Sequence, residues 1–416
     1  MICRFASLEG PPLTVVASRA VPRHRALAPW YVVECCNSYA QTLLTYCAYY
    51  YAQRQLGATP SQRLWLAAGW GVTYVAISLL AGRLAHRLGT RRLVVLTMAG
   101  SVLTALGGLV MLRAPGLWAL FAVMTCYSFT SSQAWPSLEA AVARSPGAMS
   151  LPSRLTIYNL TWAATSFLAL ASADAVMHLG WAAVFIVPSV VHLAAAVYAA
   201  TQTIPESMLL RHEVPAPPDG PSALAVATRT QTLLLMAWLA NAMAYMAINV
   251  LIPALPTLTR NMASGSASAG SLWGFARFAG FVLFWVWGAW HYRVRYMLLF
   301  HALLAAAFCC LLVFPTSAAV FYGGQVVFGL SIAFIYASSL YYAMHTSAGG
   351  STHASIHEAL IGAGVAVGPT IGALAGVGGD RLPPIGLAVA TVLVLGGIVL
   401  AILGRRAARA APARAC

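Results

Sequence analysis

The chain has 416 residues, of which 60% are hydrophobic and only 8% charged, and its mean hydropathy is +0.77. Soluble domains carry roughly 25% charged residues, so this composition excludes a water-soluble globular fold and favours a protein that lies in a lipid bilayer. The net charge of +15 comes from arginines alone, and their spacing along the chain argues against a nucleic-acid-binding surface.

Twelve segments are long and apolar enough to cross a bilayer, since about 20 apolar residues span its hydrocarbon core. They are residues 30–52, 64–82, 93–112, 117–135, 154–176, 181–201, 230–256, 271–290, 296–314, 319–344, 355–376 and 385–404. Residues 1–29 lack the apolar stretch of a signal peptide and are expected to form a cytosolic tail. Residues 202–229 are polar and proline-rich, which predicts a cytosolic linker. The linker separates six-helix bundles at residues 30–201 and 230–404, and a basic cytosolic tail follows at residues 405–416.

The arginines are distributed unequally between the two sides of the membrane that these segments define. Eighteen lie in tails and loops on the side of the N-terminus, five lie on the opposite side, and Arg277 lies within a span. Cytosolic loops carry such an excess, so both termini are expected in the cytosol. We therefore expect a multi-pass protein of a plasma membrane, of the bacterial inner-membrane type, with the lipid bilayer as a partner and no nucleic acid.

The two halves of the chain share a spacing of polar residues. The residues that repeat at an offset of 204 positions are Asn37, Gln41 and Thr45 in the first half and Asn241, Tyr245 and Asn249 in the second. A basic turn after Gly82 also recurs after Gly288, at an offset of 206. Matches at nearly one offset indicate a duplicated six-span unit, which is typical of secondary transporters.

The turn between spans two and three reads GRLAHRLGTRR, from Gly82 to Arg92. It resembles the corresponding turn of the major facilitator superfamily, Gly-x-Leu-Ala-Asp-Arg-x-Gly-Arg-Arg, and the resemblance extends through the twelve spans and the linker. The matching residues are Gly82, Leu84, Ala85, Arg87, Gly89 and Arg91, whereas His86 replaces the aspartate and Thr90 a basic residue. The resemblance implies an all-α integral membrane fold of 12 transmembrane helices in two pseudo-symmetric six-helix bundles.

In this family the aspartate of the turn helps to lock a cytosolic gate against the start of span eleven. Here that span starts with STHASIHEALIG, so we hypothesise that His86 and Glu358 form the gate contact with reversed polarity, the acid lying on span eleven and not on the turn. The gate residues that the resemblance implies are Gly82, His86, Arg87, Gly89, Arg91 and Glu358. The alternative, which we prefer, is that His86 faces the lipid headgroups, as loop residues usually face their surroundings.

Charged residues within the predicted spans are expensive to bury and rarely face lipid. Arg277 is expected to face a cavity and bind an anionic group, or to pair structurally with an acid. Glu34 shares a helix face with the polar stripe that starts at Asn37, and it is a candidate site for a coupled proton or else a residue at headgroup level. Glu358 is a second candidate, although an acid near a helix start also complements the helix dipole.

The two polar stripes and the aromatic residues near them are expected to line a central cavity between the bundles. The residues predicted to bind substrate are Asn37, Gln41, Asn241, Tyr245, Asn249, Arg277, Trp273 and Trp162. The alternative for the amides is hydrogen bonding between helices, and for any single aromatic residue it is packing.

Span eleven carries a glycine every four residues, from Gly364 to Gly376. A face of small residues lets a neighbouring helix approach closely, and we prefer this interpretation. The alternative is a hinge at Gly368, Pro369 and Gly372 that moves as the bundles rock.

Motifs for metals, nucleotides and disulfides are missing from the sequence. His353, His357 and Glu358 are not arranged as HExxH and have no evident third ligand, and no P-loop is present. The eight cysteines form no CxxC pair. We therefore expect no metal, no cofactor and no ATP-driven pumping.

Taken together, these features favour a secondary transporter that moves a small organic solute, anionic or amphiphilic, by alternating access. We expect a monomer without enzymatic activity, with a proton as the candidate coupled ion. Span four lacks an arginine and span five lacks the Gly-Pro pattern of drug/proton antiporters, which weakens that assignment. One alternative is a non-transporting membrane sensor or accessory protein on the same fold. Another is a lipid-modifying membrane enzyme with His357 and Glu358 at its cytosolic face.

Overall fold

A computed structural model describes residues 28–144, 149–202, 221–260, 266–314, 317–347, 351–377, 379 and 381–409. These residues form helices and connecting turns, and the predicted all-α fold is confirmed. The first part of the chain forms α1 (Ala28–Leu56), α2 (Pro60–Leu88), α3 (Thr90–Met111), α4 (Leu117–Ser131), α5 (Ala134–Arg144), α6 (Leu151–His178) and α7 (Ala183–Thr201). The second part forms α8 (Pro221–Arg260), η2 (Ala267–Ser271), α9 (Leu272–Val286), η3 (Gly288–Trp290), α10 (Val294–Leu312), α11 (Ala318–Ser347), α12 (Ser351–Ala375) and α13 (Leu382–Arg409).

Ten helices in the described part of the chain are long and apolar enough to cross a membrane. The predicted first span, α1, falls outside this set because polar residues such as Glu34, Asn37 and Gln41 lower its hydropathy. The predicted fourth span falls outside it because the helix breaks after Ser131, which leaves 15 residues in α4 before the chain continues as α5. Each predicted span thus corresponds to helical structure; the fourth is divided between α4 and α5, and the eighth is interrupted at Trp287.

Most helices extend beyond the predicted limits of their spans. α8 begins at Pro221, inside the predicted linker, and α13 continues to Arg409, inside the predicted C-terminal tail. α5 carries the fourth span on to Arg144, beyond residue 135. Hydropathy marks the part of a helix that lies in hydrocarbon, whereas backbone hydrogen bonds continue the helix into the polar interface.

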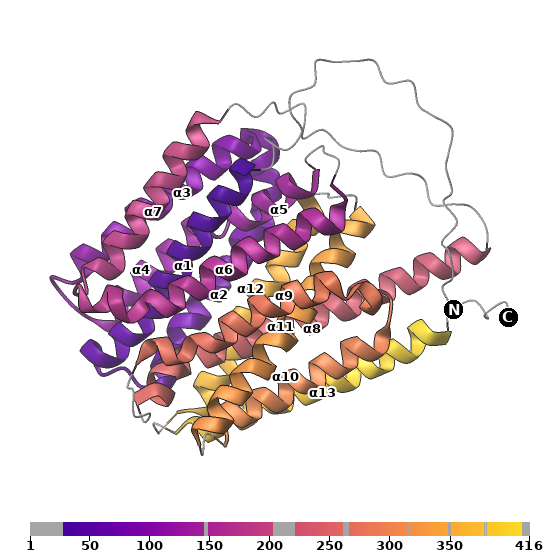
Figure 1. Cartoon of the computed structure of the whole chain (residues 1–416). Helices are drawn as coiled ribbons and strands as arrows, with labels where there is room; N and C mark the ends of the chain where they lie inside the picture. Colours follow the sequence, from indigo (N-terminus) through magenta and orange to yellow (C-terminus); the bar gives the residue numbers. More distant parts are fainter. Residues whose placement is uncertain are drawn as a thin grey trace.

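The helices form two groups that lie side by side (Figure 1). Helices α1–α7 make one group, called the N-half below, and α8–α13 make the other, called the C-half. Across the boundary, α12 runs along α2, and α6 packs against α9. The surfaces that face each other at this boundary therefore come mainly from α1, α2, α5, α6, α8, α9, α11 and α12.

Glycines permit the close approach of α12 to its neighbours in both halves. A side-chain carbon at Gly71 of α2 would collide with the backbone at Ala366 of α12, and one at Gly364 would collide with the backbone of α8. Gly368 meets Met246 of α8 in the same way. These contacts agree with the close-packing interpretation of the glycine series. The hinge role of Gly368, Pro369 and Gly372 stays a prediction.

Polar contacts also join the halves at the end of the bundle where α1 turns into α2, the predicted non-cytosolic end. Arg63 of α2 is 1% exposed, and it donates hydrogen bonds to the Pro253 carbonyl at 2.8 Å and to the Thr257 hydroxyl at 2.6 Å, both on α8. Asp174 of α6 accepts hydrogen bonds from two backbone amides of η2, at 3.1 and 2.8 Å. These bonds fasten the N-half to the C-half at this end.

Replacing Arg63 with glutamine should lower the thermal unfolding midpoint of the purified protein. The substitution removes charged hydrogen bonds between the halves and leaves buried acceptors unpaired, which typically costs about 2–4 kcal/mol. Light scattering or intrinsic fluorescence during heating in detergent measures the midpoint. Arg113→Gln is the matched control because Arg113 is exposed at the same end of the bundle. Equal midpoints for the two variants would contradict the structural role of Arg63.

Candidate functional site

A cavity lies between the two halves and is lined by residues of both. We call it the central cavity, and its lining residues include Gln41, Thr45, Trp70, Tyr74, Trp135, Trp162, Tyr245, Asn249, Trp273, Arg277, Tyr336 and Glu358. Aromatic rings form much of the wall, and a few polar groups point into it. Such a lining is typical of small-molecule sites, where apolar surface supplies affinity and sparse polar groups fix orientation.

The structure brings six of the eight residues predicted to bind substrate to this cavity, namely Gln41, Tyr245, Asn249, Arg277, Trp273 and Trp162. Asn37 and Asn241 are the exceptions. Both are buried outside the cavity, and their side-chain amides have no hydrogen-bond partner in the described part of the chain. Residues four apart share a helix face, but they also lie about 6 Å apart along the axis. The stripes therefore extend past the end of the cavity.

Arg277 of α9 lies between two indole rings. Its guanidinium carbon is 4.0 Å from the ring centroid of Trp162 and 4.8 Å from that of Trp273. Trp162 belongs to α6 of the N-half, so the guanidinium bridges the halves. Such cation–π contacts stabilise a desolvated cation by about 2 kcal/mol.

Arg277 has no acidic partner among the residues that the structure describes. The side chain is 3% exposed and makes no hydrogen bond or ion pair with any residue that the structure describes. Indole faces hold the flat surfaces of a guanidinium and leave its N–H donors at the edge. The geometry can therefore offer a forked donor to an anionic group in the central cavity.

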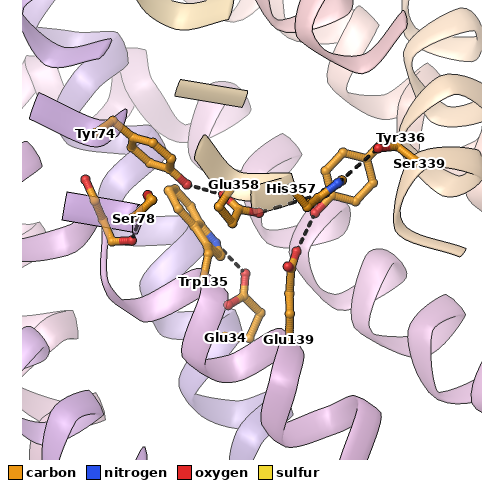
Figure 2. Close-up of polar contacts among 10 residues, drawn as sticks. Glu34, Tyr74, Ser78, Trp135, Glu139, Tyr336, Ser339, His357 and Glu358 are labelled. Carbon is orange, nitrogen blue, oxygen red and sulfur yellow. Dashed lines mark hydrogen bonds and ion pairs between the residues drawn. The ribbon is translucent and has the colours of Figure 1, made fainter. Parts of the chain in front are cut away.

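A second set of polar residues lies toward the predicted cytosolic end, and its member Glu358 lines the central cavity. Figure 2 shows the contacts within this set. Glu358 of α12 accepts a hydrogen bond from the Tyr74 hydroxyl, and Glu139 of α5 accepts one from the Tyr336 hydroxyl at 3.0 Å. His357 is paired through Nδ1 with the hydroxyl of Ser339 at 3.0 Å. We call Glu139, His357 and Glu358 the carboxylate–histidine cluster. All three side chains are buried, and they come from both halves.

Glu139 is a functional candidate that the sequence analysis missed. The predicted fourth span ends at residue 135, so Glu139 falls outside the predicted spans. In the structure a turn at residues 132–133 interrupts the helix, and the chain continues as α5, which places the Glu139 carboxylate in the interior. The apolar run SLEAAVA around Glu139 is the signal that predicts a buried helix instead of a loop.

Glu34, the first candidate for a coupled proton, lies outside the central cavity. It is fully buried in the N-half, where its carboxylate accepts hydrogen bonds from the Ser38 hydroxyl and from the Trp135 indole N–H at 3.0 Å. Figure 2 shows Glu34 and Trp135 beside the carboxylate–histidine cluster. Its role in proton coupling stays a prediction.

The hypothesised contact between His86 and Glu358 is wrong for this structure. Glu358 is buried and bonded to Tyr74, whereas His86 lies twelve residues farther along α2 and is exposed. Twelve residues of helix extend about 18 Å, so the two side chains are too far apart to meet. The preferred alternative, an outward-facing His86, fits its exposure.

The other residues of the predicted gate form the turn between α2 and α3. Gly89 has φ +80°, a conformation that favours glycine, and its N–H bonds to the Ala85 carbonyl at 3.0 Å. Arg91 donates to the Ala200 carbonyl of α7 at 2.8 Å, whereas Gly82 is partly buried and Arg87 is exposed. These contacts shape the turn within the N-half, and the gating role stays a prediction.

In the described part of the chain, the carboxylate–histidine cluster is also the only group of three His, Cys, Asp or Glu residues placed closely enough to hold a metal ion. One ligand atom from each residue lies within 4.8 Å of the others. The sequence predicted no metal because His357 and Glu358 lacked a third ligand. The fold supplies that ligand in Glu139, from a helix more than 200 residues earlier.

Solved structures that resemble this chain are transporters. A nucleoside transporter, NupG, superimposes with a TM-score of 0.68 at 11% sequence identity, over 91% of this chain and 99% of that chain. A structure reported for proton-dependent oligopeptide transporters gives a TM-score of 0.66 at 14% identity, over 94% of this chain and 98% of that chain. A bacterial homologue of human drug peptide transporters gives 0.66 at 15% identity with the same coverage. Identities this low establish a shared fold.

The family itself is established by sequence. No curated protein matches the chain. A family profile described as Major Facilitator Superfamily, however, matches residues 31–355, which is well over half of the sequence. With the twelve-span helical fold and a cavity between its halves in agreement, this chain belongs to the Major Facilitator Superfamily.

Proposed function

We propose that this protein is a secondary transporter that carries a small organic solute with an anionic group through the central cavity by alternating access. The observation that carries the proposal is Arg277, held between Trp162 and Trp273 with no acidic partner in the described part of the chain. A buried cation without a counter-charge is costly, and binding an anion offsets that cost.

The rest of the cavity wall suits a solute with both apolar surface and hydrogen-bonding groups. Gln41 and Asn249 present amides from the two halves, and the Gln41 carbonyl oxygen has no partner among the described residues. Trp162 stacks on Tyr336 with ring centroids 4.9 Å apart, which gives a flat aromatic wall beside the guanidinium. Such a wall fits a planar or apolar portion of the solute.

Alternating access requires the halves to separate at one end of the cavity while they stay joined at the other. Interhalf hydrogen bonds exist at both ends: Arg63 and Asp174 bond to the C-half at one end, and the Tyr74–Glu358 and Glu139–Tyr336 bonds lie toward the other. Each set is small and polar, so either can break without exposing a large apolar core.

A non-transporting sensor with the same cavity is the alternative function. Ligand binding alone does not separate the two, because a sensor and a transporter both need a site. Flux through reconstituted vesicles does separate them. Glu34 and Glu358 stay the candidates for a coupled proton, and the transport proposal does not depend on that coupling.

Arg277→Gln should abolish the response to anionic ligands in a thermal-shift screen of purified protein. The screen compares small organic carboxylates and phosphates with their neutral analogues, and a ligand at 100 times its Kd stabilises the folded state by about 2.7 kcal/mol. We expect wild-type hits to be anionic and to lose their effect in Arg277→Gln, with Arg113→Gln unchanged. Hits that are neutral, or that persist in Arg277→Gln, would refute the anion-binding role. Vesicles that bind a hit but show no uptake would favour the sensor.

Trp162→Leu should weaken binding of the same ligand about tenfold, because the guanidinium of Arg277 loses one of its two indole partners and Tyr336 loses the ring on which it stacks. Titration followed by thermal shift or fluorescence measures the dissociation constant. Trp118→Leu is the control, since Trp118 is 83% exposed on the outer surface of α4. If both variants bind as wild type does, the indole support of Arg277 is not part of the substrate site.

A further inference from the structure

Hydrogen bonds do not satisfy every buried polar atom of the carboxylate–histidine cluster. Glu139 Oε2 and His357 Nε2 are buried atoms with no hydrogen-bond partner in the described part of the chain. His357 Nε2 faces Glu358 Oε1 at 4.0 Å, which is too long for a hydrogen bond. Buried polar atoms usually have partners, so these two are available to bind a ligand that the structure does not contain.

Each of the three residues is held from outside by a hydroxyl group. Tyr336 donates to Glu139, Tyr74 donates to Glu358, and the hydroxyl of Ser339 pairs with Nδ1 of His357. One carboxylate oxygen or ring nitrogen of each residue is thereby left to face the centre. Metal sites show this pattern, in which outer hydrogen bonds orient the ligands and the inner atoms bind the ion.

The charge of the cluster also calls for a cation. Two carboxylates lie together in a buried site, and no arginine whose side chain is described pairs with either. Ionised carboxylates this close repel strongly where water is scarce. A divalent ion would balance both charges at once.

We propose that the cluster binds a divalent transition-metal ion of the Zn²⁺ or Mn²⁺ class, through Glu139, His357 and Glu358. Imidazole with carboxylates suits these ions, whereas Mg²⁺ and Ca²⁺ prefer oxygen ligands alone. Two ligands about 2.1 Å from a tetrahedral ion lie roughly 3.4 Å apart, so the His357–Glu358 pair needs to close by only about 0.6 Å. Glu358 lines the central cavity, which provides the path of entry and an open coordination position.

The ion would link the two halves, because Glu139 belongs to α5 of the N-half and the other two ligands to α12 of the C-half. A ligand that binds one arrangement of the halves stabilises that arrangement. Metal binding is therefore expected to hold the cluster end of the cavity closed. This inference does not rest on the transport proposal, because binding is measured without a solute and without flux.

The test uses full-length protein purified without a histidine tag and treated with a chelator. Zn²⁺, Mn²⁺ and Mg²⁺ are titrated separately by isothermal calorimetry, and the thermal unfolding midpoint is recorded with each. We expect one Zn²⁺ or Mn²⁺ per chain, with a raised midpoint, and no comparable effect of Mg²⁺. Absence of a stoichiometric transition-metal site in folded wild-type protein would overturn the proposal.

Variants locate the site. Glu139→Gln and His357→Gln should each bind Zn²⁺ at least about tenfold more weakly, and Ser339→Ala should weaken binding by about 10–100-fold through loss of the outer hydrogen bond to His357. Glu34→Gln is the matched control, because Glu34 is an equally buried carboxylate that is bonded to Ser38 and Trp135. This variant should leave Zn²⁺ binding unchanged. Unchanged binding in Glu139→Gln would overturn the proposal.

Co²⁺ substitution gives a readout that does not depend on the stability of a variant. Co²⁺ bound by nitrogen and oxygen ligands shows visible d–d bands, and these should disappear when excess Zn²⁺ is added. A sulfur-to-cobalt charge-transfer band in the near ultraviolet would place the ion at cysteines, such as the consecutive residues Cys35 and Cys36, and would overturn the assignment.

Discussion

The close approach of α12 to α2 and α8 is the constraint on which the rest of the structure depends. Lipid offers no hydrophobic driving force for helices to associate, so contact relies on packing and on small residues that let backbones meet. Gly71 on α2 and Gly364 on α12 remove side chains where α12 touches the N-half and α8. This contact places Glu358 against Tyr74 and sets the border of the central cavity.

Buried charges define what the cavity can do, and the chain stabilises them in different ways. Arg277 is held by aromatic faces, which leave its donors available to a bound anion. Glu34 is held by two hydrogen bonds inside the N-half. Glu139 keeps one oxygen without a hydrogen-bond partner in the described part of the chain, and Glu358 keeps Oε1 4.0 Å from His357 Nε2, so this site is complete only with a proton or a cation. The first and last arrangements point to ligands.

The sequence predicts which residues share a face of one helix, because the helix period alone sets that arrangement. Of the polar stripe on α1, Gln41 and Thr45 line the cavity, whereas Asn37 lies one turn beyond it. The prediction for Arg277 rested on the cost of a charge within a span, and that cost applies to any helix in a bilayer. The hypothesised His86–Glu358 contact is wrong because a family motif gives residue types and no distances. Glu358 bonds to Tyr74, and twelve residues of α2 separate Tyr74 from His86.

The amino-acid sequence by itself determined the membrane location, the twelve helical spans and the family, because hydrophobic length, arginine placement and a local turn motif act within short segments. It also identified Arg277 as an isolated charge. Only the tertiary structure decided that Trp162 of one half covers Arg277 of the other, and that Glu139 meets His357 and Glu358. The physical reason is that such contacts depend on the relative rotation and depth of helices far apart in the chain, which packing of whole helix faces sets and local sequence does not.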